Sequence, residues 1–288
     1  MQPTSNAFKS QVHDALLNPN LQSALGKMKV GFPAKRLQAI DRLPEFDALR
    51  DQARDIKNHV LENIDWYLER YEENVRKSGG HVHWARTPEE ARRIVLELCQ
   101  KLGARTATKG KSMIAEEIAL NDHLAANGVE PIETDLGEYI IQIRNEAPSH
   151  IIAPAVHLTK EQVETSFREA HTGLDPKRNL DEAASLVAEA RHMLRDRFIA
   201  ADVGITGANF LIAETGTSII VTNEGNGDLT QLLPKAHIVL ASLEKIVPTL
   251  EDAAAILRVL ARSATGQEMS VYTTFSTGPK RPDDADGP

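Results

Sequence analysis

Runs of β-branched and apolar residues alternate with amphipathic helical segments along most of the chain, and this alternation limits the fold more than any other feature. The segments expected to form strands are residues 81–84, 104–108, 129–134, 139–143, 150–156, 218–222, 237–241 and 270–275. The segments expected to form helices are residues 88–102, 113–126, 160–170, 180–200 and 250–264. Strands that alternate with helices are typical of a largely parallel sheet with helices on its faces. The sequence therefore predicts an α/β fold.

Three of these helices are preceded by residues that favour a helix start. Thr87 is followed by a proline at the first helical position and by a glutamate three residues after the threonine. Thr159 stands three residues before Gln162, and Thr249 stands directly before the helix expected from residue 250. These residues predict where the three helices begin.

The N-terminal part of the chain differs from the rest. Residues 1–45 mix short helical patterns with glycines and prolines, which suits an arm better than a packed domain. From residue 45 to 78 the apolar residues recur at intervals of three and four, and two glycines follow, so one long helix is expected. The end, residues 280–288, is polar and lacks core-forming residues. We therefore divide the chain into an N-terminal helical arm with a long helix (1–78), an α/β domain (79–279) and a polar tail (280–288).

Charge and cysteine content exclude several classes of protein. The 288 residues carry 33 basic and 41 acidic side chains, a formal net charge of −8, and no basic block interleaved with aromatic residues, so we expect no nucleic-acid partner. Cys99 is the only cysteine, which excludes a disulfide framework or a cysteine-held metal centre within this chain. His81 and His83 share one face of an expected strand but have no further ligand nearby, so we expect no metal site. No apolar run is long enough to span a membrane, and we expect a cytoplasmic protein.

Residues 213–228, AETGTSIIVTNEGNGD, place glycines, hydroxyls and carboxylates on both sides of a short β-branched run. The run at 218–222 is expected to be a buried strand, and its flanking glycines allow backbone conformations that other residues avoid. Loops at the ends of a buried strand often display binding and catalytic groups. The candidate residues here are Glu214, Thr215, Gly216, Thr217, Ser218, Asn223, Glu224, Gly225 and Asn226. The alternative is that they are ordinary turn residues.

A second candidate site lies in residues 103–112, GARTATKGKS, where a strand is expected to turn into a helix. The stretch is not a P-loop, because six residues separate its two glycines and that motif requires four. Lys109, Lys111 and Ser112 nevertheless stand where backbone N–H groups and the helix dipole favour an anion. Solvated lysines beside a capping serine are the alternative. If the strands are parallel, this turn and the loop after residue 222 share one edge of the sheet, so we expect both groups to line one pocket.

Two long stretches resemble one known family. Residues 108–142, TKGKSMIAEEIALNDHLAANGVEPIETDLGEYIIQ, and residues 213–279 are similar to the LUD domain of the lactate-utilisation iron–sulfur proteins, the LutB/LldF type. The resemblance implies a NagB/RpiA/CoA-transferase-like fold, which is a sheet flanked by helices. It also implies a role in oxidising L-lactate to pyruvate as one subunit of a three-component cytoplasmic system. The implied partners are the other subunits of that system, and a small carboxylate is the candidate ligand.

The resemblance is incomplete in one respect. Members of the family continue beyond the position of Gly278 and Pro279 into a ferredoxin-like region, whose cysteines hold [4Fe–4S] clusters with four thiolates each. This chain has one cysteine, so we expect no cofactor within it and assign such clusters to full-length members of the family. The chain is then either a fragment or a stand-alone LUD protein. Its last residues resemble internal sequence of the longer proteins, which favours a fragment.

The alternative function is a self-sufficient enzyme of the NagB/RpiA/CoA-transferase-like class that acts on a phosphorylated or carboxylated metabolite. Glu214 or Glu224 would then be the nucleophile or general base. The backbone of Gly216 and of residues 225–227 would hold an oxyanion. A carboxylate that caps its own glycine loop explains each glutamate equally well. The sequence leaves this choice open.

Overall fold

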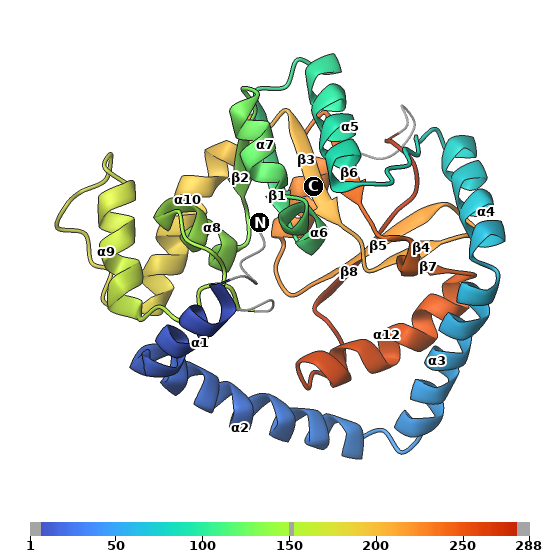
Figure 1. Cartoon of the computed structure of the whole chain (residues 1–288), viewed down its shortest axis with the longest axis horizontal. Helices are drawn as coiled ribbons and strands as arrows, with labels where there is room; N and C mark the ends of the chain where they lie inside the picture. Colours follow the sequence, from blue (N-terminus) through green and yellow to red (C-terminus); the bar gives the residue numbers. More distant parts are fainter. Residues whose placement is uncertain (1–6, 150–152, 281–288) are drawn as a thin grey trace. The chain divides into compact units, whose positions relative to one another are not determined.

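A computed structural model of the chain describes residues 7–149 and 153–280. The contacts between Cα atoms divide the chain into two compact units, each built from three separate segments. Unit 1 takes its residues from Met1–Gly31, Thr87–Thr206 and Asn226–Ile238, and unit 2 from Phe32–Arg86, Gly207–Gly225 and Val239–Pro288. Each unit contains a β-sheet with helices against it (Figure 1). The predicted α/β class is therefore confirmed.

The sheet of unit 1 is built around β1 (Thr106–Gly110), which lies between two parallel neighbours. The strands follow the order β2-β1-β3-β6. The other strands are β2 (Glu130–Glu133), β3 (Val203–Gly207) and β6 (Ala236–Leu240). Lys109 of β1 is in register with Glu133 of β2 and with Ile205 of β3. The carboxyl ends of β1 and β2 therefore lie at the same edge of the sheet, and the segments that follow them begin side by side.

The helices of unit 1 come before, between and after its strands in the chain. They are α1 (Phe8–Leu17), α5 (Pro88–Lys101), α6 (Met113–Glu117), α7 (Leu120–Ala126), α8 (Leu136–Arg144), α9 (Lys160–Ala170), α10 (Ala183–Ala200) and α11 (Asn226–Leu232). One apolar core joins β2 to α8, α9 and α10 through Ile132, Tyr139, Phe167 and Leu194. The burial of this apolar surface holds the loop after β2 against the sheet. The helix α2 (Pro19–Asp41) belongs to unit 1 up to Gly31 and to unit 2 beyond it.

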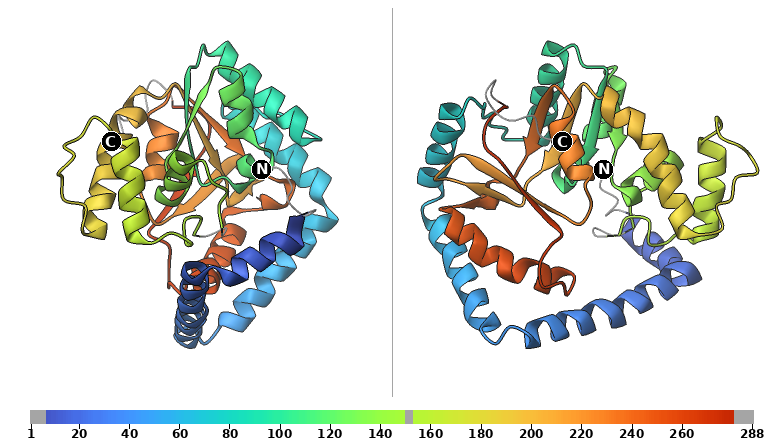
Figure 2. Two further views of the ribbon diagram at one scale, coloured as in Figure 1. Left: turned by 60° about the vertical axis from the view of Figure 1, so that its left-hand side comes forward. Right: turned by 180° about the vertical axis from the view of Figure 1, so that it is seen from behind.

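Unit 2 has a mixed sheet in the order β7-β4-β5-β8. Its strands are β4 (Phe210–Ile212), β5 (Thr217–Thr222), β7 (Ile246–Val247) and β8 (Tyr272–Ser276). Strand β5 is antiparallel to both β4 and β8, whereas β4 and β7 are parallel. The helices are α3 (Phe46–Glu62), α4 (Ile64–Lys77) and α12 (Leu250–Ala264), with a 3₁₀ turn η2 (Leu243–Lys245). Helices α3 and α12 lie side by side (Figure 2), joined by a core that includes Phe46, Leu49 and Val259.

The predicted helix starts at three threonines are confirmed. The Thr87 hydroxyl accepts a hydrogen bond from the backbone N–H of Glu90 at 3.2 Å, and Thr249 accepts one from Asp252 at 3.2 Å. Thr159 and Gln162 form a complete capping box at the start of α9. Each hydroxyl satisfies a backbone donor that lacks a partner within its own helix. Within residues 7–149 and 153–280, no helix is both long enough and apolar enough to cross a membrane.

Two predicted helices are interrupted. The helix expected from residue 45 to 78 is divided into α3 and α4 at Asn63, where φ is −130° and the side-chain amide donates to the His59 carbonyl at 2.8 Å. An asparagine that bonds its own backbone competes with the helical hydrogen bonds. The helix expected over 113–126 is divided into α6 and α7 by Ala119, whose φ is 51°. In the N-terminal arm, by contrast, short helical pieces separated by glycines and prolines are expected, but α2 continues through Pro33 as one helix.

Some predicted strands are wrong. Residues 139–143 belong to helix α8, in which Tyr139, Ile140 and Ile141 are all buried. A helix packed on more than one side has a continuous apolar run, which imitates a buried strand. Residues 81–84 and 153–156 form no strand, and residues 150–152 lie outside the described part of the chain. The two glycines after β5, Gly225 and Gly227, do not have the positive φ that glycine favours, whereas Gly216 before β5 does (72°).

Candidate functional site

The structure assigns the predicted site residues to two different units. Lys109, Lys111, Ser112 and Asn226 belong to unit 1. Glu214, Thr215, Gly216, Thr217, Ser218, Asn223, Glu224 and Gly225 belong to unit 2. The members in unit 1 come together at the carboxyl ends of β1 and β2, as described below. The expectation that both groups line one pocket stays a prediction.

Lys109 forms the centre of the polar residues in unit 1. It was expected in a turn, but it lies within β1, where its side chain is only 2% exposed. Its Nζ lies 2.8 Å from Oε1 of Glu133, the residue in register with it on β2, and that carboxylate is 5% exposed. The Nζ also lies 3.9 Å from Oε1 of Glu116 on α6. A buried lysine requires such carboxylate partners, because an unpaired charge is costly away from water.

Lys111 and Asp135 form a second pair just beyond the strand ends. The Lys111 side chain is ion-paired with Oδ1 of Asp135, and its backbone N–H donates to Oδ2 of the same carboxylate at 2.9 Å. Asn226 at the start of α11 donates from Nδ2 to Asp135 Oδ1 at 2.9 Å. Ser112 is the predicted capping serine of α6, since its hydroxyl accepts from the Ala115 N–H at 3.3 Å. The two lysines are therefore not solvated cations, because Lys109 is paired with Glu133 and Lys111 with Asp135.

Close packing fixes the backbone under these pairs. A Cβ on Gly110 would lie 2.5 Å from Oγ1 of Thr134, and one on Gly204 would lie 1.8 Å from the Thr230 carbonyl of α11. Thr134 Oγ1 donates to the Lys109 carbonyl at 2.9 Å and lies 3.3 Å from Thr230 Oγ1. Glycine is thus required at these two positions, at Gly110 so that the segment after β2 can approach β1, and at Gly204 so that α11 can approach β3.

The electrostatics of this region favour proton uptake. Burial, with the charge of Asp135 nearby, raises the pKa of Glu138 to about 7. Burial also raises the pKa of Glu116, while Lys109 opposes that shift. Glu116 and Glu138 therefore hold a proton more readily than an isolated carboxyl group would.

Three acceptor oxygens in this region have no hydrogen-bond partner among the described residues. They are Oε2 of Glu133, Oδ1 of Asn121 and Oδ1 of Asn226. Asn121, on α7, uses its amide nitrogen to donate to Glu133 Oε1 at 2.6 Å. We call the whole set the carboxyl-edge cluster, and it comprises Lys109, Lys111, Glu116, Asn121, Glu133, Asp135, Glu138 and Asn226. Buried polar atoms are nearly always hydrogen-bonded in proteins, so these oxygens require an explanation.

Five of the eight residues of the carboxyl-edge cluster were missed from the sequence. Glu116, Asn121, Glu133, Asp135 and Glu138 were not among the candidates. A signal was available for Glu133 and Asp135, because they stand at the end of the strand expected at 129–134, next to the strand that carries Lys109. In a parallel sheet the ends of neighbouring strands meet at one edge.

In unit 2 the predicted residues form a tightly held turn between β4 and β5. The hydroxyls of Thr215 and Thr217 lie 2.7 Å apart, and that of Thr217 lies 2.6 Å from Thr277. A Cβ on Gly216 would lie 2.5 Å from the backbone nitrogen of Val75, so this glycine is required for contact with α4. Asn74 of α4 donates to the carbonyls of residues 213 and 214 at 2.8 and 2.9 Å. These bonds fasten the turn to α4.

The remaining candidates of unit 2 are spread over its surface and sheet. Glu214 and Glu224 are exposed, and Gly225 has open space around its Cα. Ser218 is buried in β5, opposite Leu211 and Ser276 of the neighbouring strands. Asn223 exchanges hydrogen bonds of 3.4 and 3.2 Å with Gln267. This arrangement connects the loop after β5 to the segment before β8.

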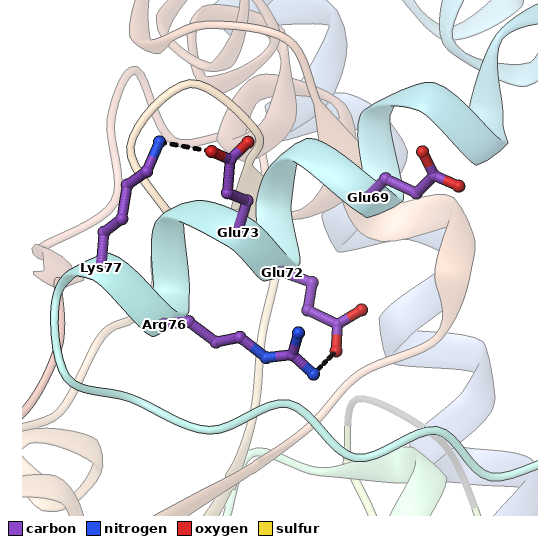
Figure 3. Close-up of a pocket in the computed structure, with 5 residues that line it drawn as sticks. All are labelled: Glu69, Glu72, Glu73, Arg76 and Lys77. Atoms are coloured by element: carbon purple, nitrogen blue, oxygen red, sulfur yellow. Dashed lines mark ion pairs between the residues drawn. The ribbon is translucent and has the colours of Figure 1, made fainter.

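A shallow hollow on α4 has no features of a binding site. Five charged side chains of this one helix line it: Glu69, Glu72, Glu73, Arg76 and Lys77 (Figure 3). Arg76 is ion-paired with Glu72 at 2.5 Å and Lys77 with Glu73 at 2.6 Å, both at a spacing of four residues. Pairs of this spacing stabilise an exposed helix by a few tenths of a kcal/mol. The hollow therefore reflects side chains paired along the helix.

The residues of this chain do not fit an iron–sulfur cluster. A [4Fe–4S] cluster takes four thiolates, and the sequence has one cysteine. Cys99 is fully buried in α5, and burial raises the pKa of its thiol to about 11. A thiol that keeps its proton is a poor ligand. Among the described residues, no group of three histidine, cysteine, aspartate or glutamate side chains is arranged to hold a metal ion.

Comparison with known proteins reveals clear relatives. The family called LUD domain matches residues 68–287. Lactate utilization protein B of Bacillus licheniformis is 44% identical over 282 residues, which are 98% of this chain and 58% of that protein. The protein of the same name from Lysinibacillus sphaericus is 43% identical over 100% of this chain and 60% of its own length. The one from Bacillus subtilis is 43% identical over 99% of this chain and 59% of its own length. The chain thus spans about three-fifths of the length of these relatives. No solved structure matches it.

Proposed function

This chain belongs to the LUD-domain family, and from that premise we propose that it is the LUD portion of an iron–sulfur subunit in a cytoplasmic system that oxidises L-lactate to pyruvate. One observation carries the proposal. Identity of 44% extends over 98% of the chain to a protein named for lactate utilisation. Similarity of this extent includes the arm before residue 68, which lies outside the LUD-domain match.

The proposal gives the chain a binding role and leaves electron transfer to clusters held elsewhere. Oxidation of L-lactate to pyruvate removes two electrons and two protons from the substrate. The residues of this chain do not hold a cluster, so no electron-transfer step is assigned to them. The LUD portion would bind the other lactate-utilisation subunits and the substrate, and Glu138 of the carboxyl-edge cluster can exchange a proton near neutral pH.

Disruption of the gene for this chain in its own host tests the proposal. We expect loss of growth on L-lactate as the sole carbon source and unchanged growth on pyruvate. An affinity-tagged copy should co-purify with the other lactate-utilisation subunits. Normal growth on L-lactate together with no co-purified subunit would count decisively against the proposal.

A further inference from the structure

The carboxyl-edge cluster contains a matched donor and acceptor at its buried end. The Lys109 ammonium has three N–H donors, and its contact with Glu133 Oε1 at 2.8 Å uses one of them. Oε2 of the same glutamate has no partner among the described residues, although the side chain is 95% buried. Oδ1 of Asn121 also has no hydrogen-bond partner among the described residues, although the amide nitrogen of this side chain donates to Glu133. A ligand at this point would therefore meet both donor and acceptor atoms.

The charges select the kind of chemical group that fits. A cation would lie against the Lys109 ammonium, which would repel it. A bare carboxylate would lie against Glu133, within a cluster whose carboxyl groups outnumber its lysines. A hydroxyl is neutral and acts as donor and acceptor at once, so it can donate to Glu133 and accept from Lys109. Hydrogen bonds to charged groups of this kind are among the stronger ones in proteins.

The position of the pair also suits a ligand. Lys109 and Glu133 lie at the carboxyl ends of two parallel strands, the edge at which open α/β sheets bind their ligands. Exposure increases over a short distance, from 2% at Lys109 to 29% at Glu116, whose Oε1 lies 3.9 Å from the lysine Nζ. A side chain that reaches solvent therefore lies next to the buried pair.

We propose that Lys109 and Glu133 bind the hydroxyl group of a 2-hydroxy acid, with Glu133 accepting the hydrogen bond of the hydroxyl and Lys109 donating to its oxygen. This inference rests on the proposed function, which supplies L-lactate as the candidate substrate. It changes the expected role of the lysines, since the site recognises the hydroxyl and not the carboxylate of the ligand.

Binding of four small molecules to the full chain tests this assignment. L-Lactate and its neutral amide, lactamide, carry the hydroxyl, whereas pyruvate and propionate have a carboxylate without it. Isothermal titration calorimetry at pH 7 and constant ionic strength should show that the two hydroxyl compounds bind at least about tenfold more tightly than the other two, because a site built for a hydroxyl leaves its polar groups unpaired without one. Equal affinity for L-lactate and pyruvate would overturn the proposal. So would the absence of binding by both hydroxyl compounds.

A pair of variants on the same strand separates the site from a general charge effect. Glu133→Gln should weaken L-lactate binding by about tenfold or more, since a neutral amide accepts a weaker hydrogen bond than a carboxylate. Glu130→Gln removes a carboxylate of β2 that is exposed and paired with Arg197 at 3.0 Å, and it should leave binding unchanged. Equal weakening by both variants would contradict the assignment. If circular dichroism shows that Glu133→Gln does not fold, the calorimetry with the four small molecules on the wild-type chain tests the proposal by itself.

Failure of this binding site and failure of the proposed function would give different experimental results. A chain that fails to bind any hydroxyl compound but is needed for growth on L-lactate would keep the proposed function and lose this site. A chain that binds L-lactate as described but is not needed for that growth would keep the site and lose the lactate-oxidation role.

Discussion

Gly110 shows how closely single residues are constrained at the edge of the unit 1 sheet. An added Cβ would lie 2.5 Å from Thr134 Oγ1, whose hydroxyl is held by the Lys109 carbonyl. Gly110→Ala should therefore lower the free energy of unfolding by about 1–3 kcal/mol, the usual effect of overpacking. Urea denaturation measures the change. Gly225→Ala is the matched control, since nothing lies within 4 Å of its added Cβ and a change below about 0.5 kcal/mol is expected. Equal effects would contradict the packing argument.

Glu138 makes stability depend on pH in a defined direction. Its pKa is about 7 in the folded chain against an ordinary value of 4.5, so between these values the folded state holds a proton that the unfolded state releases. The wild-type protein consequently loses stability as the pH rises from about 4.5 to 7. Glu138→Gln removes this loss. Above pH 7 the variant should be more stable by on the order of 1 kcal/mol, discounted because the side chain is partly exposed, and below pH 4.5 the two should agree. Thermal melts from pH 4 to 8 would show a constant difference if the idea is wrong.

The members of the carboxyl-edge cluster differ in how visible they are in the sequence. Lys109, Lys111 and Ser112 stand out because glycine, lysine and serine follow a strand pattern directly. Their carboxylate partners were missed because the pairing is long-range. Glu133 is 24 residues from Lys109, and only the register of β1 with β2 brings them together. Local patterns identify the ends of strands, but they do not determine which ends become neighbours.

At the level of elements, local signals predicted what local interactions determine. The helix starts after Thr87, Thr159 and Thr249 were found because a capping hydroxyl acts within three residues. Residues 139–143 were assigned wrongly because their apolar run is compatible with a strand or a buried helix. The packing of Tyr139 and Ile140 against α9 and α10 stabilises the helix, and a single sequence does not reveal that packing.

A buried polar network connects three of these helices. His171, at the end of α9, lies 2.8 Å from the hydroxyl of Tyr139 on α8 and 2.7 Å from Glu189 on α10. Arg178 Nε lies 2.5 Å from the second oxygen of Glu189. The imidazole is 2% exposed, so water cannot replace a lost partner. The network therefore links the helices through hydrogen bonds as well as apolar contacts.

Removal of one hydroxyl from this network should be costly. Tyr139→Phe leaves a ring nitrogen of His171 without its partner, and the free energy of unfolding should fall by about 1–3 kcal/mol. Tyr272→Phe on β8 is the control, because Tyr272 is 44% exposed and the change should be near zero. Denaturant titration of both variants provides the comparison. If Tyr139→Phe is as stable as the wild type, the hydrogen bond between Tyr139 and His171 contributes no net stability.

At the level of the whole molecule, the chain passes repeatedly between two compact units. Each unit combines three segments that are distant in sequence, such as Gly207–Gly225 with Phe32–Arg86 in unit 2. Sequence patterns are local and do not disclose a division of this kind. The linear division at residues 78 and 279 stays a prediction. Within each unit, however, the alternation of strands and helices was a sufficient guide to the α/β class.

The last prediction concerns redox competence of the whole chain. Two copies of the chain together bring two thiols, whereas one cluster requires four thiolates, and Cys99 is buried with a pKa raised to about 11. The 288-residue protein, reconstituted anaerobically with iron and sulfide, should therefore fold, remain colourless and transfer no electrons from L-lactate. Visible absorbance after desalting measures cluster content, and circular dichroism measures folding. A thiolate-to-iron absorbance band that scales with protein concentration and disappears in Cys99→Ser would contradict the argument, because it would require thiolates that the folded chain does not provide.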